Sequence, residues 1–221
     1  MSDSRSFEYL ICIDFEATCW DQDLGVALME KKREIIEFGA VLLNLRTGAT
    51  ESEYHEYVRP TNNPILSEYC KNLTGISQAL IDRQQPFPVI YHQFIDWLTD
   101  IRAAKKLQFT TPANRRSGND ANTTFCSWTN FDLGTFLQWD CDRLGIKRPD
   151  YLRAWIDARK IFMNKFYIKC KFEQALARMN IVRTGNAHSA IDDAKMLAKL
   201  MMRLNQKGAR INAVTTYNFN T

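Results

Sequence analysis

The chain opens with a short apolar run that ends in acids. Residues 9–15, YLICIDF, have the pattern of a buried β-strand, and the run stops at Asp14 and Glu16. Segments 34–45 and 52–60 are apolar or alternate polar with apolar residues, and the RTGAT sequence between them is typical of a turn. This pattern predicts a three-stranded antiparallel meander.

Apolar spacing predicts that the rest of the chain is mainly helical. Residues 87–101 and 189–204 each place apolar side chains on one helical face. The polar stretch 110–124 interrupts this pattern and is expected to be an exposed loop. Further helices are expected at 66–77, 132–146 and 171–181, and a further strand at 125–131. Strands that come first and then alternate with helices predict an α/β or α+β domain with a mixed sheet.

Asp14 and Glu16 are separated by one residue at the end of the first strand. Side chains on a strand alternate between faces, so both carboxylates leave the same side, roughly 7 Å apart at ~3.3 Å rise per residue. Neighbouring carboxylates repel each other, so one must be protonated or a cation must lie between them. The simpler alternative is that the strand ends in solvent and both acids are hydrated.

Two adjacent acids open the last predicted helix, and they face different ways. Apolar residues follow Asp193 at offsets 3, 4, 7, 8 and 11, so Asp193 begins the face that packs on the core. Asp192 is aligned instead with a row of lysine and arginine side chains, and Ser189-x-x-Asp192 matches a capping box. Asp192 therefore has a structural explanation. Asp193 could be held by backbone amides or could bind a metal ion.

His188 and Asp132 also lie at the ends of predicted elements. His188 is in the loop TGNAHS, a placement that suits a mobile general base, although a single loop histidine is more often only a surface residue. Asp132 follows the strand 125–131 and opens a helix, where an N-cap is the simplest interpretation. Strand–helix junctions are also where α/β folds place functional side chains.

Composition limits the class of protein without identifying it. The 221 residues are 45% hydrophobic, which suits one domain with its own core. A net charge of +4 permits an anionic partner but does not require one. The six cysteines include no C-x-x-C pair, which argues against a zinc site. Because no apolar run suits a signal peptide or a membrane span, we expect an intracellular protein of the cytoplasm, nucleus or both, not secreted and with no membrane partner.

Taken together, four acids and one histidine recur at the ends of elements: Asp14, Glu16, Asp132, His188 and Asp193. If these carboxylates converge, they need divalent cations, and oxygen ligands select Mg²⁺ or Mn²⁺. Two such ions about 3.5–4 Å apart can clamp the attacking and leaving oxygens of a phosphodiester. The histidine would then deprotonate the attacking water.

The order and spacing of these residues resemble the DEDDh exonucleases of the ribonuclease-H-like superfamily. The segments IDFEATCW, REIIEFGAVLLN, HEYVRPTNNPILSEYCKNLTGIS, FIDWL and HSAIDDAKMLAKL are similar to the subfamily of enhancer-of-RNAi, histone-mRNA 3′-exonuclease and Snipper nucleases. The resemblance implies an α/β, ribonuclease-H-like mixed five-stranded sheet, a three-stranded antiparallel meander plus parallel strands, flanked by helices. It places a short extension at 1–8, a single exonuclease domain at 9–210 and a tail at 211–221.

The resemblance also implies a reaction and roles for the acids. The expected activity is metal-dependent 3′→5′ hydrolysis of RNA, with DNA as a second candidate substrate, releasing nucleoside 5′-monophosphates with two divalent cations, Mg²⁺ or Mn²⁺. Asp14, Glu16 and Asp193 would hold one cation. Asp14 would bridge to the second, which Asp132 would support through water, and His188 would be the general base.

The same resemblance implies substrate contacts. Tyr69 and Phe131 would sandwich the 3′-terminal base, and Ala17 and Thr18 would contact its sugar. The family usually has tryptophan where this chain has Phe131, so the smaller ring should stack less extensively. The alternative for both aromatic residues is packing in the core.

Basic side chains supply candidate phosphate contacts. The segment RKIFMNKFYIKCKF interleaves basic and aromatic residues, as backbone-tracking grooves do, although an amphipathic element with a solvated basic face would have the same composition. The candidates are Lys165, Lys169 and Lys171 in this segment, and Arg115 and Arg116 in the polar stretch.

Two alternative functions remain open at this point. The first is a DEDDh DNase or oligonucleotide exonuclease, which competition between matched RNA and DNA would distinguish. The second is an inactive nucleic-acid-binding adaptor, and the presence of all five chemical residues argues against it.

Overall fold

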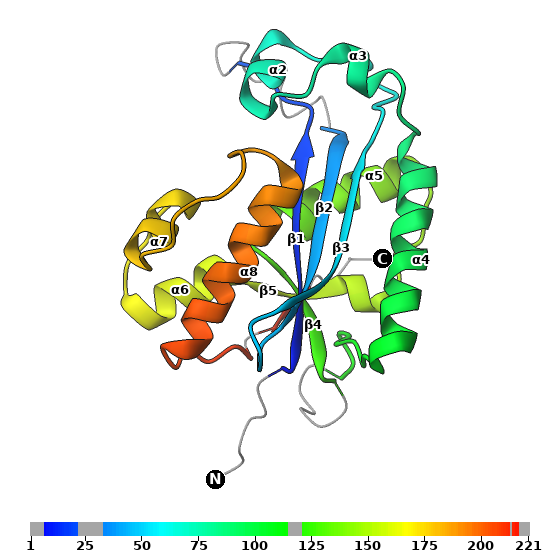
Figure 1. Ribbon diagram of the computed structural model, residues 1–221. Helices are drawn as coiled ribbons and strands as arrows, with labels where there is room; N and C mark the ends of the chain where they lie inside the picture. Colours follow the sequence, from blue (N-terminus) through cyan, green and yellow to red (C-terminus); the bar gives the residue numbers. More distant parts are fainter. Residues whose placement is uncertain (1–6, 22–32, 115–120, 213, 217–221) are drawn as a thin grey trace.

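A mixed β-sheet forms the centre of the computed structural model, which describes residues 7–21, 33–114, 121–212 and 214–216 (Figure 1). Within this part of the chain the strand order is β3-β2-β1-β4-β5-β6. The β1–β2, β2–β3 and β5–β6 pairs are antiparallel, and the β1–β4 and β4–β5 pairs are parallel. The strands are β1 (Tyr9–Ala17), β2 (Ile35–Asn44), β3 (Thr50–Tyr57), β4 (Thr123–Ser127), β5 (Ala154–Asp157) and β6 (Val214–Thr216).

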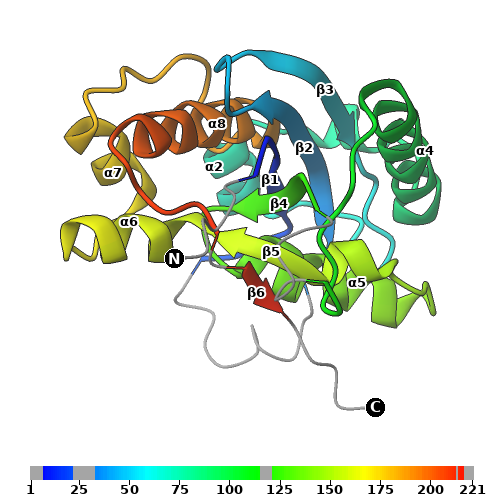
Figure 2. The same cartoon turned by 90° about the horizontal axis from the view of Figure 1, so that it is seen from below.

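Helices cover both faces of this sheet, as Figures 1 and 2 show. Helix α4 lies on one face, α8 lies on the other, and α2 and α3 lie beyond the end of β1. Among the helices in the described ranges, none is long and apolar enough to cross a lipid bilayer. In the described part of the chain the α-helices are α2 (Glu68–Thr74), α3 (Gln78–Ile81), α4 (Phe87–Lys105), α5 (Leu137–Arg143), α6 (Ala158–Phe166), α7 (Phe172–Arg178) and α8 (Ala190–Gln206).

Alternation along β1 divides its side chains between two hydrophobic clusters. Ile11, Ile13 and Phe15 pack in the cluster that includes α4, whereas Leu10 and Cys12 pack in the cluster that includes α8. A central strand buried on both faces has a nearly continuous apolar sequence, which explains the opening run. Residues 14 and 16 continue the row on the α8 side.

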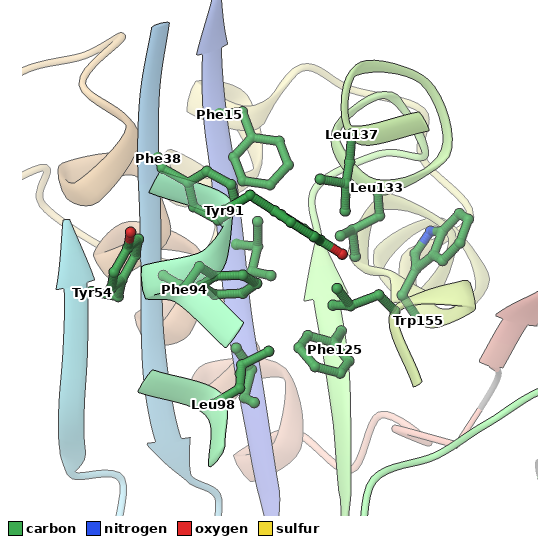
Figure 3. Packing of buried hydrophobic residues seen from close by; sticks show 14 of the residues in the cluster. Phe15, Phe38, Tyr54, Tyr91, Phe94, Leu98, Phe125, Leu133, Leu137 and Trp155 are labelled. Atoms are coloured by element: carbon green, nitrogen blue, oxygen red, sulfur yellow. The ribbon is translucent and has the colours of Figure 1, made fainter. Parts of the chain in front are cut away.

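Buried aromatic and aliphatic side chains pack between α4 and the sheet (Figure 3). Phe38 of β2 packs on Phe94 of α4 with ring centroids 4.6 Å apart. Tyr54 of β3 lies edge-on to Phe38, and its hydroxyl donates a hydrogen bond to the carbonyl oxygen of Ile90 at 2.8 Å. Aromatic packing of this kind fixes the strands against α4 and restricts their movement.

A glycine on β2 lets the amino end of α8 approach the sheet. A Cβ atom added to Gly39 would lie 2.3 Å from the backbone carbonyl carbon of Ala190. Real Cβ atoms do not approach backbone this closely, so helix and strand could not both stay in place. Gly39 therefore sets the distance of the first turn of α8 from β1 and β2.

We expect Gly39→Ala to destabilise the protein by about 3 kcal/mol, because overpacking against backbone cannot be relieved by a side-chain rotation. The displaced α8 would also carry Asp193 away from β1, so any activity that needs Asp193 beside β1 should fall together with stability. Urea unfolding and a turnover assay of the folded fraction measure the two effects. A variant with unchanged stability and turnover would contradict the close approach.

Over the described residues, the sheet has one strand more than the five expected. The short strand β6 pairs antiparallel with β5, with Ile156 opposite Val214 and Ala154 opposite Thr216. It lies inside the range 211–221 that was expected to be a tail. Three residues are too few to show a clear period in the sequence, so only the pairing with β5 identifies this strand.

The expectation of an exposed loop over 110–124 is wrong at both of its ends. Thr123 and Thr124 are buried at the start of β4. Thr110 is also buried, and its N–H and hydroxyl both donate to the carbonyl oxygen of Thr123. Threonine is polar but favours strands, so low hydrophobicity alone was misleading here. Arg115 and Arg116 lie outside the described residues.

Candidate active site

A pocket of about 570 Å³ opens at the carboxyl end of β1. Asp14 and Glu16 line it from β1, and His188 and Asp193 line it from the amino end of α8. Glu16, His188 and Asp193 each offer a ligand atom, and these atoms lie within 4.8 Å of one another. Asp132 adjoins the same place, because its Oδ1 accepts the backbone N–H of Phe15 at 3.2 Å. The fold thus brings together the five residues that the sequence singled out.

Strand pairing adds a buried acid, Glu37, that the sequence analysis missed. Glu37 of β2 lies directly opposite Glu16 in the register of the sheet. It is 1% exposed, and its Oε1 lies 2.8 Å from Nε2 of His55 and accepts the hydroxyl of Ser189 at 3.2 Å. The sequence feature that could have identified Glu37 is its position as a single acid inside the apolar segment IIEFGAVLL. Its partners hold β2, β3 and the start of α8 together behind the pocket.

The two acids at the start of α8 point in different directions, as their spacing predicted. Asp193 is buried at 8% exposure and lines the pocket. Asp192 is half-buried, and its Oδ2 accepts the backbone N–H of Asn186 at 2.8 Å. The predicted capping box is wrong: Ser189 is the N-cap residue, but its hydroxyl donates to Glu37 rather than capping the helix. Asp192 instead fixes the loop that precedes α8.

Asp132 begins a π-helical turn, Asp132–Phe136, immediately before α5. It is 6% exposed and is the first residue of this turn, so it is not the N-cap that its sequence position suggested. Its hydrogen bond to Phe15 joins the turn that follows β4 to the end of β1. The two parallel strands therefore deliver their acids to the same edge of the sheet.

His188 lies in a strained turn directly above Asp193. Its φ of 62° is in the left-handed region, which costs a non-glycine residue of order 1–2 kcal/mol. Its backbone N–H donates to Oδ2 of Asp193 at 3.1 Å, while its side chain is exposed at the pocket. An exposed ring held by its own backbone over a carboxylate cluster can exchange protons with solvent molecules in the pocket.

Burial and mutual repulsion oppose ionisation of the acids. Burial raises the pKa of Asp14 well above its usual range, and the neighbouring carboxylates add to the shift. Burial likewise raises the pKa of Glu16 to about 9 and that of Asp132 to about 7. The pKa of Asp193 is raised too, since burial outweighs the ion pair with Arg183. Such a cluster binds protons or cations more strongly than isolated carboxylates do.

These donors fit a hard divalent cation. The converging side chains offer carboxylate oxygens and one imidazole nitrogen. Oxygen-rich sites of this kind suit Mg²⁺ and Mn²⁺ better than softer metals. Positive charge between the carboxylates would also remove the repulsion that raises their pKa values.

Arg183 is a further charged residue that contacts two residues of this pocket, and the sequence gave no signal for it. Its Nη2 lies 2.6 Å from Oδ1 of Asp193. Its Nε donates to Oε1 of Glu173 at 2.9 Å, and Glu173 itself lines the pocket. The guanidinium group thus connects α7 to the first turn of α8.

The residues expected to contact the terminal nucleotide fall into two groups. Tyr69 and Phe131 are 40% and 61% exposed, so neither is only a core residue. Ala17 and Thr18 are buried at the end of β1, and the Thr18 hydroxyl accepts the backbone N–H of Glu34 at 3.0 Å. The sugar contact of Ala17 and Thr18 stays a prediction.

The three candidate lysines separate in space. Lys171 lines the active-site pocket together with Arg159. Lys169 lines a neighbouring pocket of about 350 Å³, which also includes Arg159 and Phe131. Lys165 lines a third hollow, beside Gly208, and its Nζ donates to the Gly208 carbonyl oxygen at 3.3 Å. Arg159, which belongs to both of the first two pockets, joins them.

Comparison with known proteins supports this geometry. Residues 11–201 match the RNase_T family model, described as exonuclease. The chain is 41% identical to the 3′–5′ exonuclease Snipper of Drosophila melanogaster over 93% of its own length and 72% of that protein. It is 40% identical to ERI1 exoribonuclease 2 of Xenopus laevis over 90% of its own length, but it spans only 28% of that protein.

A solved structure shows the same architecture. The nuclease domain of 3′hExo, described as a DEDDh family member bound to rAMP, superposes with a TM-score of 0.80 at 30% identity. The superposition covers 96% of this chain and 98% of that domain. The family model, the Snipper relative and the five converging residues agree, and the chain belongs to the DEDDh branch of the exonuclease family.

Proposed function

We propose that this chain is a divalent-metal-dependent 3′→5′ exonuclease that releases nucleoside 5′-monophosphates from the 3′ end of RNA. The observation that carries this proposal is the convergence of three of the carboxylates and His188 at one pocket, with the carboxylate of Asp132 adjoining it. The preference for RNA is supported by relatives named exoribonucleases and by the domain described as bound to rAMP.

Asp14, Glu16 and Asp193 would hold Mg²⁺ or Mn²⁺, and Asp132 would support a second cation through water. Bound cations supply positive charge for the phosphate oxygens and lower the pKa of a water molecule. The protein itself contributes the positions of the carboxylates, because β1, the turn after β4 and α8 hold them in place before substrate binds.

His188 would accept the proton of the attacking water. Its exposed ring is at the pocket, and the bond from its backbone N–H to Asp193 holds it over the carboxylates. A positioned general base of this kind contributes about 10²–10⁴ to the rate. Phe131 and Tyr69 would stack on the terminal base, and stacking tolerates all four bases.

The adjoining pocket supports a path for the strand upstream of the scissile phosphate. Arg159 lies in both pockets, and the second adds Lys160 and Lys169 beside Phe131. We infer that phosphates follow these three basic side chains. Lys165 contributes to neither pocket and lies off this path.

The activity is tested with matched RNA and DNA of one sequence, each labelled once at the 5′ end and once at the 3′ end. The expected result with Mg²⁺ is a ladder of shortened 5′-labelled RNA and immediate release of labelled 5′-monophosphate from the 3′ end. RNA should be degraded faster than DNA.

Other outcomes identify the alternatives. Preferential loss of the DNA indicates a DNase, and degradation only of very short strands indicates an oligonucleotide exonuclease. Binding of RNA with no degradation of any strand indicates an adaptor domain and contradicts the proposal.

A further inference from the structure

Arg183 occupies one oxygen of a carboxylate that the proposed function assigns to a metal ion. Oδ1 of Asp193 lies 2.6 Å from Nη2 of Arg183, and Oδ2 accepts the backbone N–H of His188 at 3.1 Å. Oδ2 therefore accepts a hydrogen bond, whereas Oδ1 is paired with Arg183 by charge and accepts no well-aligned hydrogen bond. A cation that binds Oδ1 must compete with the guanidinium group.

The two partners of Asp193 differ in how easily they can leave. The N–H of His188 is fixed by the backbone turn at the start of α8. The guanidinium of Arg183 is on a flexible side chain from the loop after α7. It is the partner that can move without unfolding the helix terminus, so a cation would take Oδ1 in its place.

Glu173 provides a second carboxylate for the displaced guanidinium. Arg183 already donates to Oε1 of Glu173 from Nε at 2.9 Å, and Nη2 also contacts this oxygen. The guanidinium lies 5.9 Å from the ring of Phe172, which limits its movement on the other side. Release from Asp193 thus leaves Arg183 bound to α7 rather than free in solvent.

We propose that Arg183 is a displaceable counter-ion: it pairs with Asp193 while no cation is bound, and it moves fully onto Glu173 when a divalent cation binds Oδ1. This proposal rests on the proposed function, because it needs Asp193 to be a metal ligand. Arg183 would then weaken metal affinity by the free energy of the ion pair that must be broken. If Arg183 only attached its loop to α7 and α8, replacing it would not tighten metal binding.

The test is calorimetric titration of Mn²⁺ into metal-free protein, with no nucleic acid present. Arg183→Met should bind Mn²⁺ at least about fivefold more tightly than the unaltered chain, as expected for removal of a coupled competitor. Arg178→Met is the matched control: it removes the same charge from an exposed position on α7. If Arg178→Met tightens binding equally, or if Arg183→Met binds Mn²⁺ with equal or lower affinity, the proposal is overturned.

The result separates this proposal from the proposed function. An unaltered chain that binds no Mn²⁺ and degrades no RNA contradicts both. If the unaltered chain binds Mn²⁺ and degrades RNA, but Arg183→Met binds Mn²⁺ no more tightly, only the counter-ion proposal is contradicted. If Arg183→Met does not fold, the Nε–H NMR signal of Arg183 in the unaltered chain, assigned with Arg183→Lys, gives a second measurement. It should shift on Mg²⁺ addition, and an unmoved signal would overturn the proposal.

Discussion

Replacing Asp14 by asparagine is expected to remove exonuclease turnover while raising thermal stability in metal-free buffer. The substitution keeps the shape of the side chain but removes a charge from the centre of the carboxylate cluster. Loss of several kcal/mol of transition-state stabilisation corresponds to at least ~10³ in rate, at about 1.4 kcal/mol per factor of ten. Stability should rise because burial and the neighbouring acids disfavour the ionised form of Asp14.

Turnover of labelled RNA and thermal melting in EDTA measure these two effects. Asp192→Asn and Asp193→Asn form the matched pair, since they are adjacent and differ in which face they occupy. Asp193→Asn should lose turnover as Asp14→Asn does. Asp192→Asn keeps an acceptor for the N–H of Asn186 and should retain most of the turnover. If Asp192→Asn abolishes turnover and Asp193→Asn retains it, the assignment of faces on α8 is wrong.

Removing divalent cations is expected to abolish turnover and to make stability depend on pH. The pKa of Glu16 is raised from 4.5 to about 9 and that of Asp132 from 3.8 to about 7. An acid whose pKa is higher in the folded state contributes stability below its unfolded value, and this is lost as pH rises through the folded value. The melting temperature of metal-free protein should therefore fall from about pH 4, near the unfolded pKa values, to about pH 9.

Cation binding should reverse this fall and release protons. Carboxylates that are protonated at neutral pH must lose their protons to bind Mg²⁺ or Mn²⁺, so affinity rises with pH. Calorimetry of Mn²⁺ binding at pH 7 in buffers of different ionisation enthalpy counts the protons released. Turnover that persists in EDTA would contradict the metal-dependent mechanism. Zero proton release would contradict the raised pKa values.

Much of the site followed from local periodicity. The period of two along β1 placed Asp14 and Glu16 on one face, and the helical period of α8 turned Asp193 inward and Asp192 outward. Both periods hold within a single element, so they can be read before the fold is known. The motif resemblance then supplied Asp132 and His188 with their roles, and the structure brings all five residues to one edge of the sheet.

The missed features depend on contacts between segments that are distant in sequence. Glu37 matters because strand register sets it opposite Glu16, and Arg183 matters because a loop places it on Asp193. The sequence does contain a capping-box pattern, but the hydroxyl of Ser189 donates a hydrogen bond to Glu37 and does not cap the helix. A local pattern cannot show which of two competing partners a polar group will meet.

The sequence by itself determined which faces carry the acids and to which family the motifs are similar, because side-chain direction within a strand or helix is a local property. Only the tertiary structure decided which charges share the pocket and which of the three lysines adjoin it. Those outcomes depend on strand register, on the close approach of α8 at Gly39 and on the path of the loops. Each of these is set by packing between elements rather than by any one of them.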